Sequence, residues 1–127
     1  MPSFAAAGKG LPALAQVLIF TGFAIGFLVK MPAVPLHGWL VPAYVQSATP
    51  VTAFIAAVLG KMGAYGLIRV SAALPLGADA AAPMLGALGA AGVLVGALLA
   101  GRQTALKPMI AWSSLSHVGF IVVGIAA

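Results

Sequence analysis

A handful of charged residues divides this sequence into long stretches that carry no charge at all. Four such stretches hold 20, 30, 22 and 20 residues, and they are Gly10–Val29, Met31–Gly60, Ala80–Gly101 and Pro108–Ala127. A helix needs about 20 mainly apolar residues to cross the hydrocarbon core of a bilayer. Helices are the expected spanning elements, because a backbone in lipid must satisfy its own hydrogen bonds. The chain is therefore predicted to be an all-α integral membrane protein with about four transmembrane helices.

The composition excludes the main alternatives to a membrane protein. Charged residues make up 6% of the chain, against about 25% in soluble domains, so there is too little charge to coat a water-facing surface. A disordered chain needs the opposite composition. The absence of Cys excludes thiolate zinc sites and Cys-ligated iron–sulfur clusters. The net charge of +5 comes from scattered basic residues, which does not indicate nucleic-acid binding.

The predicted organisation is a single transmembrane domain over residues 1–127. Pro32 and Pro35 interrupt the first apolar run, because proline lacks a backbone donor and disfavours helix at the preceding residue. Met1–Gly10 and Ser71–Ala82 are expected to be loops. Gly22 and Gly26, and likewise Gly92 and Gly96, have the spacing that lets helices approach closely. We expect helices at about 11–46 (broken near 31–35), 49–70, 83–100 and 106–126.

Two lysines lie where lipid would surround a helix. Lys61 falls near the middle of its predicted span, where a lysine costs roughly 2.5–3.5 kcal/mol, so we expect it to be buried against protein or water. Burial disfavours the charged form of a lysine, which suits it to take up and release a proton. A bond to the carbonyl of a neighbouring helix is the alternative. Lys30 either closes a simple helix and extends to the interface, or lies at a proline break inside the membrane, as at transporter ion sites.

Two histidines and their neighbours are further candidates. His37 follows the break, and His117 lies within the last predicted helix, four residues after Ser113. Imidazole can shuttle protons near neutral pH, although a packed histidine is the alternative. Tyr65 lies one turn from Lys61 and is a candidate partner. We expect no metal site and no covalent catalysis, because the chain has one acid and two histidines.

Three motifs in the same order resemble the antiporter-like proton-pumping membrane subunits of respiratory complex I. The segment VKMPAVPLHGWL at 29–40 resembles the family's broken-helix motif. The segments TPVTA at 49–53 and LGKMGAYGLIR at 59–69 resemble the next helix of the family. The segment KPMIAWSSLSHVGF at 107–120 resembles a third helix of the family. The wording is most similar to the M subunit, called chain 4 in mitochondria and plastids. The resemblance covers about 100 residues.

The resemblance implies roles for three residues and a fold. Lys30 would be the lysine of the broken helix, Lys61 the central lysine of the next helix, and His117 a histidine that links two half-channels. Together they would form a proton relay along the membrane midplane, within a bundle of inverted repeats. Members have about fourteen helices, so this chain would be a fragment, a split gene product or a truncated relative. Flavin, iron–sulfur clusters and quinone chemistry would belong to partner subunits, with no cofactor in this chain.

The sequence departs from the family pattern at six positions. They remove polar groups and bring full pumping activity into question, but they leave the three relay candidates in place. The changed positions are Val41, Pro42, Tyr44, Ala48, Ala105 and Pro108, where the family usually has Pro, Asp, His, Pro, an acid and Arg.

The function implied by this resemblance is proton translocation coupled to electron transfer in an NADH:quinone oxidoreductase. The chain would lie in a bacterial inner membrane or its organellar equivalent, beside other membrane subunits. It would supply no redox centre of its own. Alternatives are a subunit of a multisubunit Na+/H+ antiporter or membrane-bound hydrogenase, and a non-conducting membrane scaffold.

Overall fold

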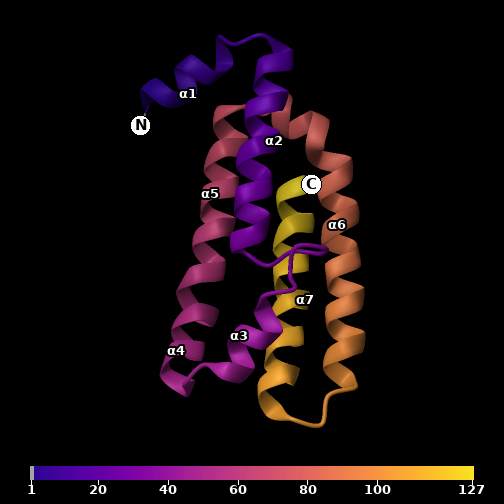
Figure 1. The fold of residues 1–127 in the computed structure, drawn as a ribbon. Coiled ribbons are helices and arrows are strands. Elements are labelled where there is room, and N and C mark those ends of the chain that lie inside the picture. Colours follow the sequence, from indigo (N-terminus) through magenta and orange to yellow (C-terminus); the bar gives the residue numbers. More distant parts are fainter. Residues whose placement is uncertain (1) are drawn as a thin grey trace.

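The computed structural model describes residues 2–127, and all the regular elements in that range are helices (Figure 1). Among the described residues, four helical segments are long and apolar enough to span a membrane: Ala13–Lys30, Thr49–Ala73, Pro75–Gly101 and Leu106–Ala126. This confirms the all-α fold class with four transmembrane helices. In chain order the elements are α1 (Pro2–Lys9), α2 (Ala13–Lys30), α3 (Leu40–Gln46), α4 (Thr49–Phe54), η1 (Ile55–Leu59), α5 (Gly60–Ala73), α6 (Pro75–Gly101) and α7 (Leu106–Ala126).

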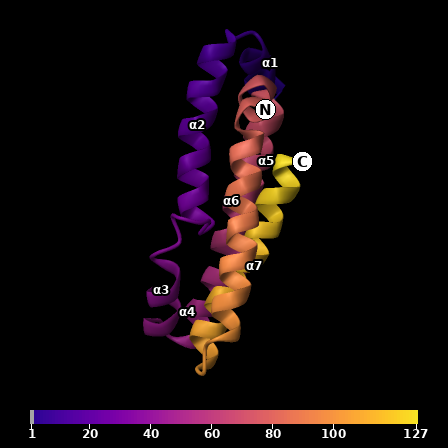
Figure 2. The same ribbon diagram turned by 90° about the vertical axis from the view of Figure 1, so that its right-hand side faces the viewer.

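The long helices run side by side, and α1 lies across one end of the bundle (Figures 1 and 2). The elements α4, η1 and α5 follow one another without a break and form one span. One apolar core cluster is built around α2, α5 and the adjacent ends of α6 and α7, with Phe20, Leu67 and Val122 fully buried. A second, smaller cluster joins α3 to α7 through Leu40, Tyr44, Ala111 and Leu115.

The predicted break in the first helix is confirmed. Helix α2 ends at Lys30, about halfway along the bundle, and the chain becomes helical again only at Leu40 (Figure 1). Met31 has φ −99° and ψ 72°, and its N–H donates to the carbonyl of Phe27. The residue before a proline avoids the α conformation, which explains why the helix stops before Pro32. The non-helical stretch is longer than the predicted break and reaches Trp39.

Two segments predicted to be loops are helical in the structure. Helix α6 begins at Pro75, not near residue 83, and Pro83 lies inside it. Proline suits the first turn of a helix, and the alanines of 78–82 are strong helix formers. A proline inside a membrane helix leaves a backbone carbonyl without its hydrogen-bond donor, and neighbouring groups can supply the missing hydrogen bond. The second segment forms α1 over Pro2–Lys9, where three successive alanines favour helix.

Close packing of α6 on α7 rests on glycine. A Cβ atom added at Gly96 would lie 2.5 Å from the backbone N of Ser116, and one added at Gly119 would lie 2.6 Å from the carbonyl oxygen of Gly89. Ser116 Oγ also donates to the carbonyl of Val93 at 3.1 Å. The spacing of Gly92 and Gly96 therefore does mark a helix interface. At Gly22 and Gly26, nothing among residues 2–127 lies within 4 Å of an added Cβ, so this pair packs against no other helix of the described part.

Candidate functional site

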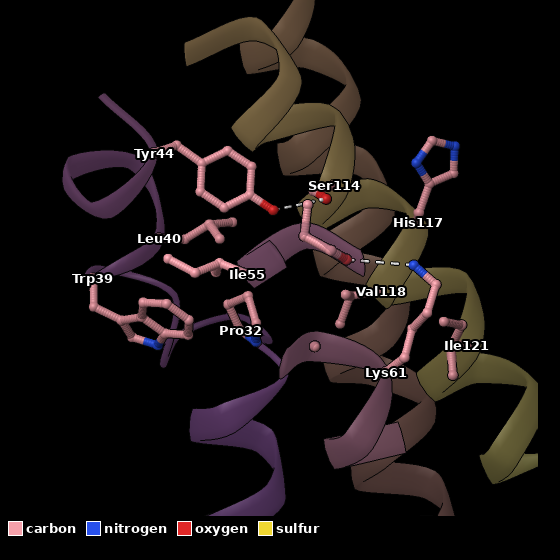
Figure 3. Close-up of a pocket in the computed structure, with 12 residues that line it drawn as sticks. Pro32, Trp39, Leu40, Tyr44, Ile55, Lys61, Ser114, His117, Val118 and Ile121 are labelled. Atoms are coloured by element: carbon pink, nitrogen blue, oxygen red, sulfur yellow. Dashed lines mark hydrogen bonds between the residues drawn. The ribbon is translucent and has the colours of Figure 1, made fainter. Parts of the chain in front are cut away.

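A partly open cavity of about 310 Å³ lies where the broken helix, the α4–η1–α5 span and α7 meet (Figure 3). Its volume leaves room for several water molecules, and a water needs polar partners to stay there. Four of the lining side chains supply such partners: Tyr44, Lys61, Ser114 and His117. The apolar part of the lining includes Pro32, Leu40, Ile55, Val118 and Ile121.

Lys61 and His117 lie at matching depths in their helices. Lys61 is twelve residues from either end of the span Thr49–Ala73, and His117 is close to the middle of Leu106–Ala126. Lys61 Nζ donates to the carbonyl of Ala56 at 3.4 Å, and the His117 imidazole points away from Lys61 in the view of Figure 3. Ala56 belongs to the π-helical turn η1, and such turns occur frequently at functional sites.

The expected burial of Lys61 is not found within residues 2–127. Both Lys61 and His117 are exposed on the lateral surface of the helices. Depth along a helix fixes the distance from the membrane surface, but only packing decides which side of the helix is covered. The structure brings these two residues to one cavity, while their side chains remain accessible from outside the chain.

Lys30 is placed apart from that cavity. It forms the last residue of α2, is exposed, and is not among the described residues that line the cavity. A cation suits a helix C-terminus, because the last carbonyls carry partial negative charge. Of the three predicted relay residues, the fold therefore brings two together and leaves Lys30 near the break.

The supporting residues named from the sequence lie elsewhere. His37 is half-buried against Trp112, with ring centroids 5.6 Å apart, and within residues 2–127 its Nδ1 atom has no hydrogen-bond partner. Tyr65 faces a separate groove and lies under the guanidinium of Arg69, 5.9 Å from ring centroid to Cζ. Ser113 lines a third depression beside Gly101. The expected pairing of Tyr65 with Lys61 is not observed.

Two cavity residues were missed as candidates. Tyr44 is 2% exposed, and its hydroxyl lies 3.4 Å from Ser114 Oγ, which is long for a hydroxyl pair. Ser114 and His117 are three apart on α7, so they share a face as Ser113 and His117 were expected to do. The sequence does carry a signal for Tyr44, which is a polar side chain within an apolar run at a position where the family usually has His.

Lys107 holds the end of α3, the short helix that carries Tyr44. Lys107 Nζ donates to the carbonyl of Ser47 at 2.9 Å, just beyond the C-terminus of α3. Ser47 Oγ and Thr52 Oγ1 are 2.7 Å apart, which ties the corner between α3 and α4. A lysine at a helix C-terminus satisfies carbonyl groups that have no partner in the helix. The corner therefore fixes where Tyr44 meets α7.

Trp39 bridges the two halves of the broken helix. Its Nε1–H donates to the carbonyl of Val29 at 2.9 Å, which caps one of the last carbonyls of α2. We expect Trp39→Phe to lower the free energy of unfolding of the chain in detergent by about 1 kcal/mol. Trp112→Phe is the control, because the Trp112 indole makes no hydrogen bond within residues 2–127. Equal losses in both variants would contradict the bridging role.

The described residues contain no group of three His, Cys, Asp or Glu side chains placed to hold a metal ion. The polar side chains that line the cavity carry hydroxyl, amine, imidazole and indole groups. Of these, the hydroxyl, amine and imidazole groups can accept and donate protons.

Comparisons with known proteins agree with this architecture. Residues 3–127 match the family model described as NADH:quinone oxidoreductase/Mrp antiporter, TM. The chain is 47% identical over 120 residues to NAD(P)H-quinone oxidoreductase chain 4 1 of a Picosynechococcus species, covering 94% of this chain and 22% of that protein. It is 46% identical over 111 residues to NADH-quinone oxidoreductase subunit M of Pseudomonas aeruginosa, covering 85% of this chain and 21% of that protein.

A third relative is similar to the same degree. F(420)H(2) dehydrogenase subunit M of Methanosarcina mazei is 46% identical over 120 residues, covering 91% of this chain and 23% of that protein. The chain thus spans between a fifth and a quarter of the length of the curated relatives it matches.

Proposed function

Because this chain belongs to the NADH:quinone oxidoreductase/Mrp antiporter membrane family, we propose that it acts within a proton-translocating membrane subunit of an NADH:quinone oxidoreductase. The observation that carries the proposal is the cavity shared by Lys61 and His117 at mid-span. A lysine at that depth is unfavourable beside lipid and is tolerated beside water or protein. The chain is an integral membrane protein, and both residues lie near the middle of their candidate spans.

In the proposed mechanism, Lys61 alternates between charged and neutral forms. The Ala56 carbonyl accepts a hydrogen bond from Lys61 Nζ, and the cavity leaves room for water beside it. The proton that Lys61 releases passes through water in the cavity to one ring nitrogen of His117. The other ring nitrogen can then give up a proton on the side away from Lys61. Lys30, at the break in the first helix, delivers or receives protons at the edge of this path.

The energy for these changes comes from partner subunits in this proposal. Electron transfer there alters the charge and hydration around Lys61, and this chain supplies no redox centre. The relatives named as subunits M and chain 4 of oxidoreductases support this division of labour. The membrane is the bacterial inner membrane or its organellar equivalent.

A second candidate is a subunit of a multisubunit Na+/H+ antiporter, because the matching family description also names Mrp antiporters. The same lysines and cavity would then serve exchange of protons against sodium, without electron transfer.

We expect an affinity-tagged form of this chain, expressed in its native cells, to purify with NADH:quinone reductase activity. Inverted membrane vesicles from those cells should take up protons when NADH is added, whether or not sodium is present. Cells that lack the chain should lose most of this uptake. Proton movement that needs a sodium gradient, with no reductase activity in the purified sample, would replace the first candidate by the second.

A further inference from the structure

The cavity has a polar end that the Lys61–His117 pair does not account for. Tyr44 enters it from α3 and Ser114 from α7, and their hydroxyl oxygens approach to 3.4 Å (Figure 3). Tyr44 has 2% of its surface exposed and is among the largest fully enclosed side chains of the chain. A polar group enclosed to that extent needs hydrogen-bond partners. Within residues 2–127, its one contact is the long one to Ser114.

We infer that the hydroxyl groups of Tyr44 and Ser114 form one end of the water chain that carries protons through the cavity of Lys61 and His117. This inference rests on the proposed function. Each hydroxyl accepts a proton from the water on one side and releases its own proton to the next group. Both side chains are neutral before and after the step, so no charge is left in the apolar wall.

The placement of Tyr44 explains how a tyrosine serves at this point. The Lys107 contact with the Ser47 carbonyl and the hydroxyl pair of Ser47 and Thr52 hold the end of α3 in place. Leu40 and Leu115 pack around the ring, so its hydroxyl has little freedom to leave the cavity. The aromatic ring fills the wall while the hydroxyl faces the polar space.

The chain provides matched controls for both hydroxyls. Tyr44→Phe and Ser114→Ala each remove one oxygen from the cavity and leave the rest of the side chain. The controls Tyr65→Phe and Ser113→Ala remove the equivalent hydroxyl oxygens from a tyrosine and a serine that face other grooves. In inverted vesicles from cells that produce the full chain, we measure protons taken up per NADH oxidised, together with the amount of assembled complex.

Tyr44→Phe and Ser114→Ala should each lower the protons moved per NADH by about threefold or more, whereas the two controls keep the parent value. Tyr44→His should keep the transport that Tyr44→Phe loses, because imidazole can carry the proton in place of the hydroxyl. Transport in Tyr44→His should depend on pH between about 5 and 8. A purely structural role predicts the reverse order, since phenylalanine preserves the shape of the ring and histidine does not.

Two results separate this inference from the proposed function. If Lys61→Met loses pumping while Tyr44→Phe and Ser114→Ala pump at the parent level, the role of the hydroxyls is overturned and the proposed function stands. Parent-level pumping in Lys61→Met would overturn the proposed function, and with it this inference.

Discussion

Lys61→Met should reduce NADH-driven proton uptake in native inverted vesicles by about tenfold or more, while the complex still assembles. Methionine has a similar length and no charge, so it can occupy the same position beside the cavity. It has no proton to release, and it cannot donate to the Ala56 carbonyl as the ammonium does. Among the described residues that line the cavity from the α4–η1–α5 span, only Lys61 has a side chain that can carry a proton.

The appropriate control is Lys9→Met, which removes the same charge from α1, outside the four spans. The amount of assembled complex is measured in parallel by NADH:quinone reductase activity in detergent. Full proton uptake in Lys61→Met, at a normal amount of complex, would contradict the relay role. A loss of equal size in Lys9→Met would show that the net charge matters and not the cavity.

Gly119→Ala should lower the free energy of unfolding of the chain by about 1–3 kcal/mol, although it adds one methyl group. The new Cβ would lie 2.6 Å from the carbonyl oxygen of Gly89 and 2.6 Å from the backbone N of Val93. Backbone atoms of a neighbouring helix cannot move aside as a flexible side chain can. The helices α6 and α7 would have to separate, and the α7 wall of the cavity would shift with them.

Gly124→Ala on the same helix should have the opposite sign. Within residues 2–127 nothing lies within 4 Å of a Cβ at that position, and alanine favours helix over glycine by about 0.5–1 kcal/mol. Both variants are compared by denaturant titration of the full chain in detergent, with helical circular dichroism as the readout. Stabilisation by both substitutions would show that α6 and α7 are not in close contact at Gly119.

The sequence alone determined that the chain crosses a membrane as helices and where its unusual groups lie along them. Charge-free runs of about 20 residues have few other solutions in lipid, and Pro32 and Pro35 lack the donors and conformational freedom that a continuous helix needs. These are local properties, so they could be identified without knowledge of neighbours. The same local reasoning failed at Pro83, where the surrounding alanines continue α6 through the proline.

Only the tertiary structure decided which groups meet. Residues four apart on a helix, such as Lys61 and Tyr65, or Ser113 and His117, lie near one face but do not point in the same direction. The packing of neighbouring helices divides each pair between two grooves. Tyr44 and Ser114 are 70 residues apart, and their approach depends on how α3 is held against α7. Helix rotation and the position of α3 result from packing between distant segments, which periodicity along one segment does not encode.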